Sequence, residues 1–146
     1  MGQGMPDDEN SKLNLLSRDV NDLMVVSSML QDAIVSAEDM AYLEKERAFV
    51  MVVNRFQWEQ PPSDGAGERI HSGVRFDKVK RVQYRNVDRQ ARNRFSVILS
   101  IAYDDGIVRI YFSGNGAVRL EVDELLCALQ DFDNPWPTIW RPDHSD

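Results

Sequence analysis

The sequence predicts an α+β domain: a mostly antiparallel curved sheet or small barrel of six to seven strands, with an early helix and a C-terminal amphipathic helix. Three observations lead to this prediction. Runs of alternating apolar residues recur along the chain with turn residues between them, which is typical of antiparallel strands. Two stretches instead place their apolar residues on one face of a helix. The composition, 42 % hydrophobic and 28 % charged over 146 residues, is that of a globular domain. A two-layer α/β sandwich is the alternative architecture.

The chain is predicted to hold one domain. Residues 1–11 are polar and acidic and predict a disordered tail, which leaves residues 12–146 as a single domain. Residues 60–72 gather Pro, Gly and Ser and predict a mobile loop. Cys127 is the single cysteine, which excludes an internal disulfide, and no apolar run is long enough for a signal peptide or a membrane span. We therefore expect a soluble, cytoplasmic protein with no membrane partner.

The N-terminal half predicts a strand, a helix and a hairpin. Residues 13–16 indicate a short strand, followed by a capping Ser or Asp and a helix from Val20 to about Ala33. The apolar face of this helix is so broad that it predicts a deeply seated helix; contact with a second copy of the chain, in a homodimer, is the alternative. Residues 40–43 and 48–58 flank a charged turn and predict a β-hairpin.

The C-terminal half predicts two further hairpins from the register of their apolar residues. If Asp105-Gly106 is a two-residue turn, Tyr103 lies opposite Val108 and the apolar residues of both strands share one face. A three-residue Gly-Asn-Gly loop after Phe112, with its last glycine in the left-handed conformation, sets Phe112 opposite Val118.

A final helix is predicted to begin near Asp123, which is a plausible cap. Its apolar face would consist of Leu125, Leu126, Ala128, Leu129 and Phe132. A meander of antiparallel strands closed by such a helix resembles the pleckstrin-homology-like architecture. This resemblance is one of strand pattern, and a fold of this kind does not determine function.

Four strings of the sequence resemble a small bacterial family known as domain of unknown function 2948. They are residues 13–23 (LNLLSRDVNDL), 30–33 (LQDA), 53–59 (VNRFQWE) and 116–121 (GAVRLE). The resemblance runs from about Leu13 to Trp136. It implies a cytosolic bacterial protein of about this length, and it implies no activity, ligand or catalytic residue.

The charge of the chain is unevenly distributed. Nine of its 17 basic residues lie between Arg69 and Arg94 with only two acidic residues among them, a local charge of +7. The eight basic and 22 acidic residues elsewhere give −14. A positive segment on an acidic protein predicts a surface for an acidic protein or an anionic ligand. Together with an Arg-aromatic string at a strand end, this segment gives the predicted binding residues: Arg55, Trp58, Arg75, Lys78, Lys80, Arg81 and Arg85.

No catalytic constellation is visible in the sequence. No His or Cys recurs at metal-ligand spacing, so we expect no metal and no cofactor. Cys127 has acidic neighbours that disfavour a thiolate, and the carboxylate pairs Glu38-Asp39 and Asp104-Asp105 suit turns. The sequence therefore favours a non-catalytic binding or interaction module that uses a basic face. An RNA-binding protein is one alternative, and an enzyme with a carboxylate-based site is another.

Overall fold

The computed structural model describes residues 14–57, 69–87 and 95–132. Of these residues, 66 % lie in nine strands and 11 % in one helix. The elements are β1 (Asn14–Ser17), α2 (Val20–Leu30), β2 (Ile34–Leu43), β3 (Ala48–Phe56), β4 (Arg69–Phe76), β5 (Val79–Arg85), β6 (Phe95–Asp104), β7 (Ile107–Phe112), β8 (Gly116–Val122) and β9 (Cys127–Phe132).

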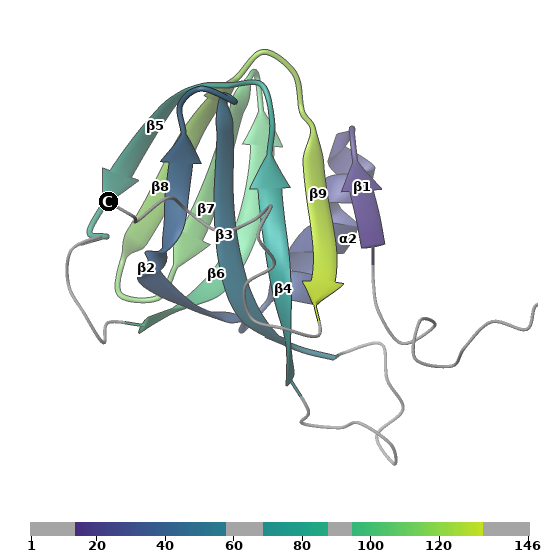
Figure 1. Cartoon of the computed structure of the whole chain (residues 1–146), viewed down its shortest axis with the longest axis vertical. Helices are drawn as coiled ribbons and strands as arrows, with labels where there is room; N and C mark the ends of the chain where they lie inside the picture. The colour runs from purple at the N-terminus through teal and green to yellow at the C-terminus, as the bar shows by residue number, and fades with distance from the viewer. Residues whose placement is uncertain (1–13, 58–68, 88–94, 133–146) are drawn as a thin grey trace, which may run out of the picture.

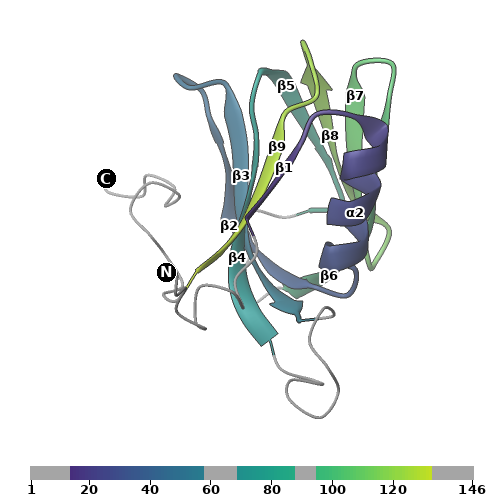
Figure 2. The same ribbon diagram turned by 90° about the vertical axis from the view of Figure 1, so that its right-hand side faces the viewer.

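The nine strands form one antiparallel sheet in the order β1-β9-β4-β3-β2-β6-β7-β8-β5 (Figure 1). Strands β1 and β5 are therefore its two edges. The sheet folds over where β2 meets β6, so that the half made of β1, β9, β4, β3 and β2 faces the half made of β6, β7, β8 and β5 (Figure 2). The described part of the chain is thus a two-layered antiparallel structure with a single helix beside it.

The core lies between the two halves and is built by the period of two in each strand. Along β3, Phe49, Met51 and Val53 point inward and are at most 1 % exposed. Along β7, Val108 and Ile110 point inward from the opposite half and are fully buried. A second, smaller apolar cluster covers the outer face of the first half and consists of Ala41, Val50, Val52 and Phe132.

Helix α2 begins and ends for local reasons. The side chain of Asp19 accepts a hydrogen bond from the backbone N–H of Asp22 at 2.8 Å, the usual arrangement of an N-cap. The helix ends three residues before the predicted Ala33, because Asp32 adopts a left-handed conformation with φ of 67°. The N–H of Asp32 then bonds to the carbonyl of Ile98, which carries the chain into β2 beside β6.

Helix α2 fills the place along β6 that β2 leaves open, since β2 pairs with β6 over three residues only. Leu23, Val26 and Leu30 of the helix enter the core. The hydroxyl of Ser27 accepts the backbone N–H of Ile101 at 2.9 Å, which satisfies an edge amide that no strand pairs. The predicted deep seating of this helix is wrong in its extent, because Leu23, Val26 and Leu30 are buried whereas Val20 and Met24 of the same broad apolar face are 47 % and 63 % exposed.

The register of one predicted hairpin is confirmed and that of the other is wrong. Tyr103 lies opposite Val108 across the Asp105-Gly106 turn, whose two residues have φ of 50° and 78°. Across the next turn, however, Phe112 lies opposite Gly116 rather than Val118. The left-handed residues are Gly114 and Asn115, so the loop begins one residue earlier than predicted and the pairing moves by two residues. The shift of two leaves the buried face unchanged.

The predicted fold class is wrong, and so is the two-layer α/β alternative. Residues expected to form a C-terminal helix are strand β9, which pairs with β4 on one side and with β1 on the other. Cys127, Leu129 and Asp131 point inward in strand alternation. Asp123 is not a helix cap but pairs with Arg47 at 2.7 Å. A nine-stranded sheet without that helix is not the six-to-seven-stranded, pleckstrin-homology-like structure expected from the strand pattern.

The described part of the basic segment forms two strands, β4 and β5. Strand β4 joins one half of the sheet and β5 the other, with Lys78 in a left-handed conformation between them. Residues 69–72, which were assigned to a mobile loop, form the beginning of β4. Among the described residues, no helix has the length and apolar content needed to cross a membrane.

Candidate functional site

The predicted basic surface lies mainly on β5, at one edge of the sheet. Lys80 and Arg81 are exposed there, with about half or more of each side chain accessible. Both have acidic neighbours: Lys80 Nζ lies 3.5 Å from Asp123 and Arg81 Nη1 lies 3.7 Å from Glu121. Arg85 donates from Nε to the carbonyl of Asn115 at 3.3 Å. Charged side chains on an edge strand also hinder pairing with another sheet, so this pattern has a purely structural use as well.

Arg75 and Lys78 do not lie on β5 itself. Arg75 is on the outer face of β4 and bonds to both Glu46, at 2.9 Å, and Asp77, at 3.0 Å. Its partial burial acts to lower its pKa, but the hydrogen bonds to Glu46 and Asp77 outweigh burial and hold the pKa above the ordinary value. Lys78 occupies the turn between β4 and β5. The acidic remainder of the chain therefore supplies partners for much of the described basic segment.

Arg55, which was predicted to bind a ligand beside Trp58, is buried. It shares the inward face of β3 with Val53 and is 0 % exposed. Trp58 lies outside the described residues. A ligand could reach Arg55 only by opening the contacts described next, and its role in binding stays a prediction.

A buried polar network surrounds Arg55 at the ends of β3, β4 and β9. Its Nε and Nη2 donate to the two carboxylate oxygens of Asp131 at 3.0 and 2.8 Å, and its Nη1 donates to the carbonyl of Phe56. The hydroxyl of Ser72 donates to Asp131 at 2.5 Å. Ser72 and Asp131 lie opposite one another in register, so three neighbouring strands place these groups together. Such bidentate pairing is the geometry that can hold a buried Arg and carboxylate.

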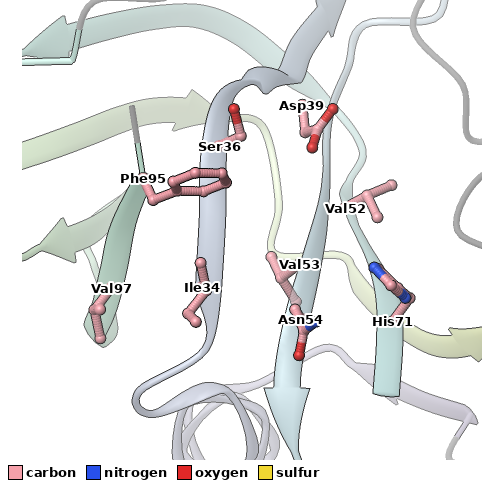
Figure 3. A pocket seen from close by; sticks show the side chains of 9 residues that line it. All are labelled: Ile34, Ser36, Asp39, Val52, Val53, Asn54, His71, Phe95 and Val97. Atoms are coloured by element: carbon pink, nitrogen blue, oxygen red, sulfur yellow. The ribbon is translucent and has the colours of Figure 1, made fainter. Parts of the chain in front are cut away.

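A cavity of about 600 Å³ lies on the outer face of the sheet, and β2, β3, β4 and β6 supply its lining. It forms where β2 and β3 stop pairing: their register shifts between Val35 and Met40, and residues 36–39 bulge away from β3. Figure 3 shows side chains of β2, β3, β4 and β6 around the opening. The described residues that line it are Ile34, Ser36, Asp39, Val52, Val53, Asn54, His71, Phe95 and Val97.

Asn54 is the polar residue that β3 contributes to the lining of this cavity. It lies between Ile34 of β2 and His71 of β4 in register. Its backbone carbonyl accepts from Arg69 Nη1 at 2.8 Å, but its side-chain Oδ1 is buried and meets no donor among the described residues. Arg69 is held over the ring of Phe56, 3.7 Å from the ring centre, and so is fixed beside the cavity. A buried acceptor without a partner is uncommon in folded proteins.

This cavity was not predicted from the sequence. The polar Asn54 directly after the apolar run from Phe49 to Val53 is a signal that could have indicated it, whereas the predicted binding residue was the neighbouring Arg55. Glu38-Asp39 was interpreted as part of a turn, whereas both residues belong to the bulge of β2. The pairing partner that makes the bulge is not visible in a local stretch of sequence.

Ser36, Asp39 and His71 line the same cavity, but no hydrogen bond joins them within the described residues. Ser36 Oγ accepts from the N–H of Glu38 at 3.4 Å, and His71 lies on β4, across the cavity from Ser36 (Figure 3). Cys127 lies in the core, where burial first and the charge of Asp77 second raise the pKa of its thiol. The described side chains therefore do not assemble a nucleophile with its base.

The described residues define the class: a small antiparallel β domain with one helix and a cavity of about 600 Å³ on its outer face. A family described as "Protein of unknown function (DUF2948)" matches residues 13–144, and the chain belongs to this family. The resemblance seen in the sequence is thereby confirmed. No curated protein matches the chain. No solved structure matches it either.

Proposed function

We propose that this chain is a non-catalytic binding module that holds a small molecule in the cavity between β2, β3, β4 and β6. The observation that carries this proposal is the cavity of about 600 Å³, whose mostly apolar lining includes the polar side chains Ser36, Asn54 and His71. Ligand sites are typically concave and mostly apolar, with a few polar groups that fix orientation, and their volumes lie in this range. The proposal keeps the class expected from the sequence, a binding module, and moves its site from the basic face to the cavity.

The walls of the cavity suit such a ligand. Ile34, Val52 and Val97 provide an apolar lining, and Phe95 adds an aromatic ring that is 67 % exposed. An exposed aromatic ring beside a cavity has apolar area to lose when a flat ligand packs against it. Binding therefore gains from burial of apolar surface.

Indole is a suitable probe, because its ring matches apolar walls and its N–H is a hydrogen-bond donor. We expect it to shift the amide NMR signals of Asn54, His71 and Phe95 in the full-length protein, with little effect on β5. Val97→Trp, which fills the cavity from β6, should abolish these shifts. Leu99→Trp is the matched control, since Leu99 lies on the same strand, is 50 % exposed and does not line the cavity. Binding that survives Val97→Trp would contradict the cavity as the site.

The RNA-binding alternative would need aromatic rings near the basic segment that can stack on bases, for which the sequence offers Trp58, Phe76, Tyr84 and Phe95. Phe76 is buried in the core, and Tyr84 packs against Phe49 with ring centres 6.4 Å apart. Among the described rings of this set, Phe95 is the one that is broadly exposed, and Trp58 lies outside the described residues. Single-strand readers present several such rings together on a basic surface.

A further inference from the structure

We propose that strand β5 accepts an extended, acidic segment of a partner protein as an additional strand at the edge of the sheet. This surface is separate from the cavity of the proposed function, so either proposal can hold without the other. Three features of the edge lead to it: an open side of the backbone, different side chains on the two faces of β5, and an excess of arginine behind them.

The edge of β5 is closed at its first residue and open beyond it. The N–H of Val79 donates to the carbonyl of Arg47 at 2.9 Å, and the carbonyl of Val79 accepts from the hydroxyl of Tyr42 at 2.7 Å. From Lys80 onward β5 pairs with β8 on one side, and no described strand pairs with its other side (Figure 1). Alternate residues of such a strand turn their N–H and C=O groups away from the sheet. Residues 80–85 therefore offer about 20 Å of backbone to one more strand.

The two faces of β5 differ in chemistry. Arg81, Gln83 and Arg85 are exposed and share the outer face, where they lie opposite residues of β8. Val82 and Tyr84 lie on the inner face, partly buried against the core. An added strand follows the same alternation, so its outer side chains would lie beside the two arginines and its inner side chains beside Val82. The edge thus fits a segment that alternates acidic and apolar residues.

The outer face beside this edge carries more arginine than its carboxylates balance. Arg109 of β7 and Arg119 of β8 lie directly opposite one another, and like charges in such a pair are destabilising. The Oε2 of Glu121 lies 3.0 Å from Nη1 of Arg119 and 3.7 Å from Nη1 of Arg81. Neither Arg109 nor Arg85 forms an ion pair among the described residues. A strand that brings carboxylates would offset this excess, whereas a basic strand would add to it.

A peptide fits this edge better than a nucleic acid does. An added peptide strand gains main-chain hydrogen bonds to β5, which a nucleic acid cannot form as a ladder. Along the described strands β7, β8 and β5, the outer face has one aromatic ring, that of the half-buried Tyr111, whereas single-strand readers present several rings. The basic side chains of the edge also disfavour ordinary strands, so they select an acidic one.

The test uses four capped heptapeptides and the wild-type protein. The first alternates Glu and Val, the second has the same residues in two blocks, the third is the first with N-methylated central amides, and the fourth alternates Lys and Val. We expect the first peptide to bind and to slow the hydrogen exchange of β5 amides. The second and third should bind at least about tenfold more weakly, because they lose several net hydrogen bonds. The Lys-Val peptide should not bind.

A charge-swapped variant then assigns the preference to the edge. Gln83→Glu combined with Arg85→Glu reverses the charge of the outer face of β5. A carboxylate at position 83 keeps an acceptor for Nη1 of Arg119, which donates to Gln83 at 2.6 Å. This variant should lose the Glu-Val peptide and bind the Lys-Val peptide. Arg18→Glu is the matched control, because Arg18 is exposed beside β1, at the other edge of the sheet, and both peptides should behave toward it as toward the wild type.

The outcomes separate the parts of the proposal. Equal binding of the N-methylated and unmethylated peptides to the wild-type protein would overturn strand addition. Equal binding of the Glu-Val and Lys-Val peptides would overturn the selection of an acidic segment. If poly-U RNA binds and none of the peptides does, the face is a nucleic-acid surface and the proposal fails, as it does if no probe binds. Binding of indole to the cavity is measured separately and decides only the proposed function.

Discussion

Strand β5 and the ends of β3 and β4 both carry the polar residues that the sequence marked as candidates, but the two regions use them in opposite ways. On β5, Lys80 and Arg81 lie in solvent, each within about 4 Å of an exposed or half-exposed carboxylate. At the strand ends, Arg55 is fully buried in a bidentate pair with Asp131, and the adjacent Asn54 is one of the residues that line a cavity. The comparison teaches that the dense charge of this sequence lies on a solvent-exposed edge of the sheet, whereas the isolated Arg55 at the end of an apolar strand belongs to a buried polar network.

The energetic difference between the two regions follows from desolvation. An exposed ion pair is screened by water and contributes about 0–1 kcal/mol to stability. A buried pair costs free energy to desolvate, and removal of one partner leaves the other as an uncompensated charge. Matched removal of one carboxylate from each region therefore separates them.

The largest loss of stability is expected for Asp131→Asn. This change leaves the Arg55 guanidinium buried and without its counter-charge, and should lower the free energy of unfolding by about 3–5 kcal/mol. Glu121→Gln is the matched control, because it removes a carboxylate that faces Arg81 and Arg119 in a more exposed setting, and it should cost no more than about 1 kcal/mol. Urea denaturation midpoints measure both. Similar midpoints for the two variants would show that the network around Arg55 is not energetically distinct from the surface pairs.

A double variant tests whether the unpaired charge of Arg55 causes this loss of stability. Replacing Arg55 by Met and Asp131 by Leu removes both charges, so most of the stability lost in Asp131→Asn should return. If the double variant is as unstable as the single one, the loss comes from packing around Ser72 rather than from an unpaired charge.

The parts of the fold that the sequence predicted correctly depend on local chemistry. The Asp105-Gly106 turn needs two residues in the left-handed conformation, which Asp and Gly provide, and the register of its two strands follows. The start of α2 follows in the same way from the capping side chain of Asp19. Each of these features is decided by residues that are neighbours in sequence.

The parts that were wrong depend on distant partners. The apolar residues Leu125, Leu129 and Phe132 fit the face of a helix, but strand alternation places Cys127 and Leu129 inward equally well. The choice is made by β4 and β1, which pair with β9 from both sides. The cavity depends in the same way on the bulge between β2 and β3, so its residues come from four strands and share no sequence motif.

A smaller loss of stability is expected when the C-terminal segment is deleted. The sequence predicts that the segment with Trp136 and Trp140 packs on the body of the domain; these residues lie outside the described residues. The outer-face cluster gives this prediction a reason, because Val50 and Val52 are buried there and β9 ends at Phe132 in the same cluster. Deletion of residues 134–146 should lower the free energy of unfolding by about 1–3 kcal/mol for each tryptophan that loses its contacts.

A shorter deletion provides the control for that experiment. Removing residues 141–146 takes away polar residues and retains both tryptophans, so its unfolding midpoint should remain close to that of the intact chain. An unchanged midpoint in the longer deletion would mean that the tryptophans contribute no packing to the fold. The outer face of the first half of the sheet would then be available to a partner.

The smallest effect on stability, and the sharpest test of β5 as a functional surface, is expected for Lys80, Arg81 and Arg85 changed together to Ala. Arg75 is left in place, because its two ion pairs with Glu46 and Asp77 make it part of the structure. The three exposed side chains should contribute no more than about 1 kcal/mol in total to stability, since their acidic neighbours are solvated.

Because these exposed ion pairs are weak, a polyanion could displace the acidic neighbours of Lys80 and Arg81. If the basic face binds, single-stranded poly-U RNA or polyglutamate should bind the wild-type chain about a hundredfold more weakly at 200 mM than at 50 mM salt, given about four neutralised charges. The variant should lose this binding while still binding indole with unchanged affinity, because the cavity contains none of the three residues. Polyanion binding that is equal in both proteins and insensitive to salt would reduce β5 to solvated charge on a protected sheet edge, with the cavity as the remaining functional candidate.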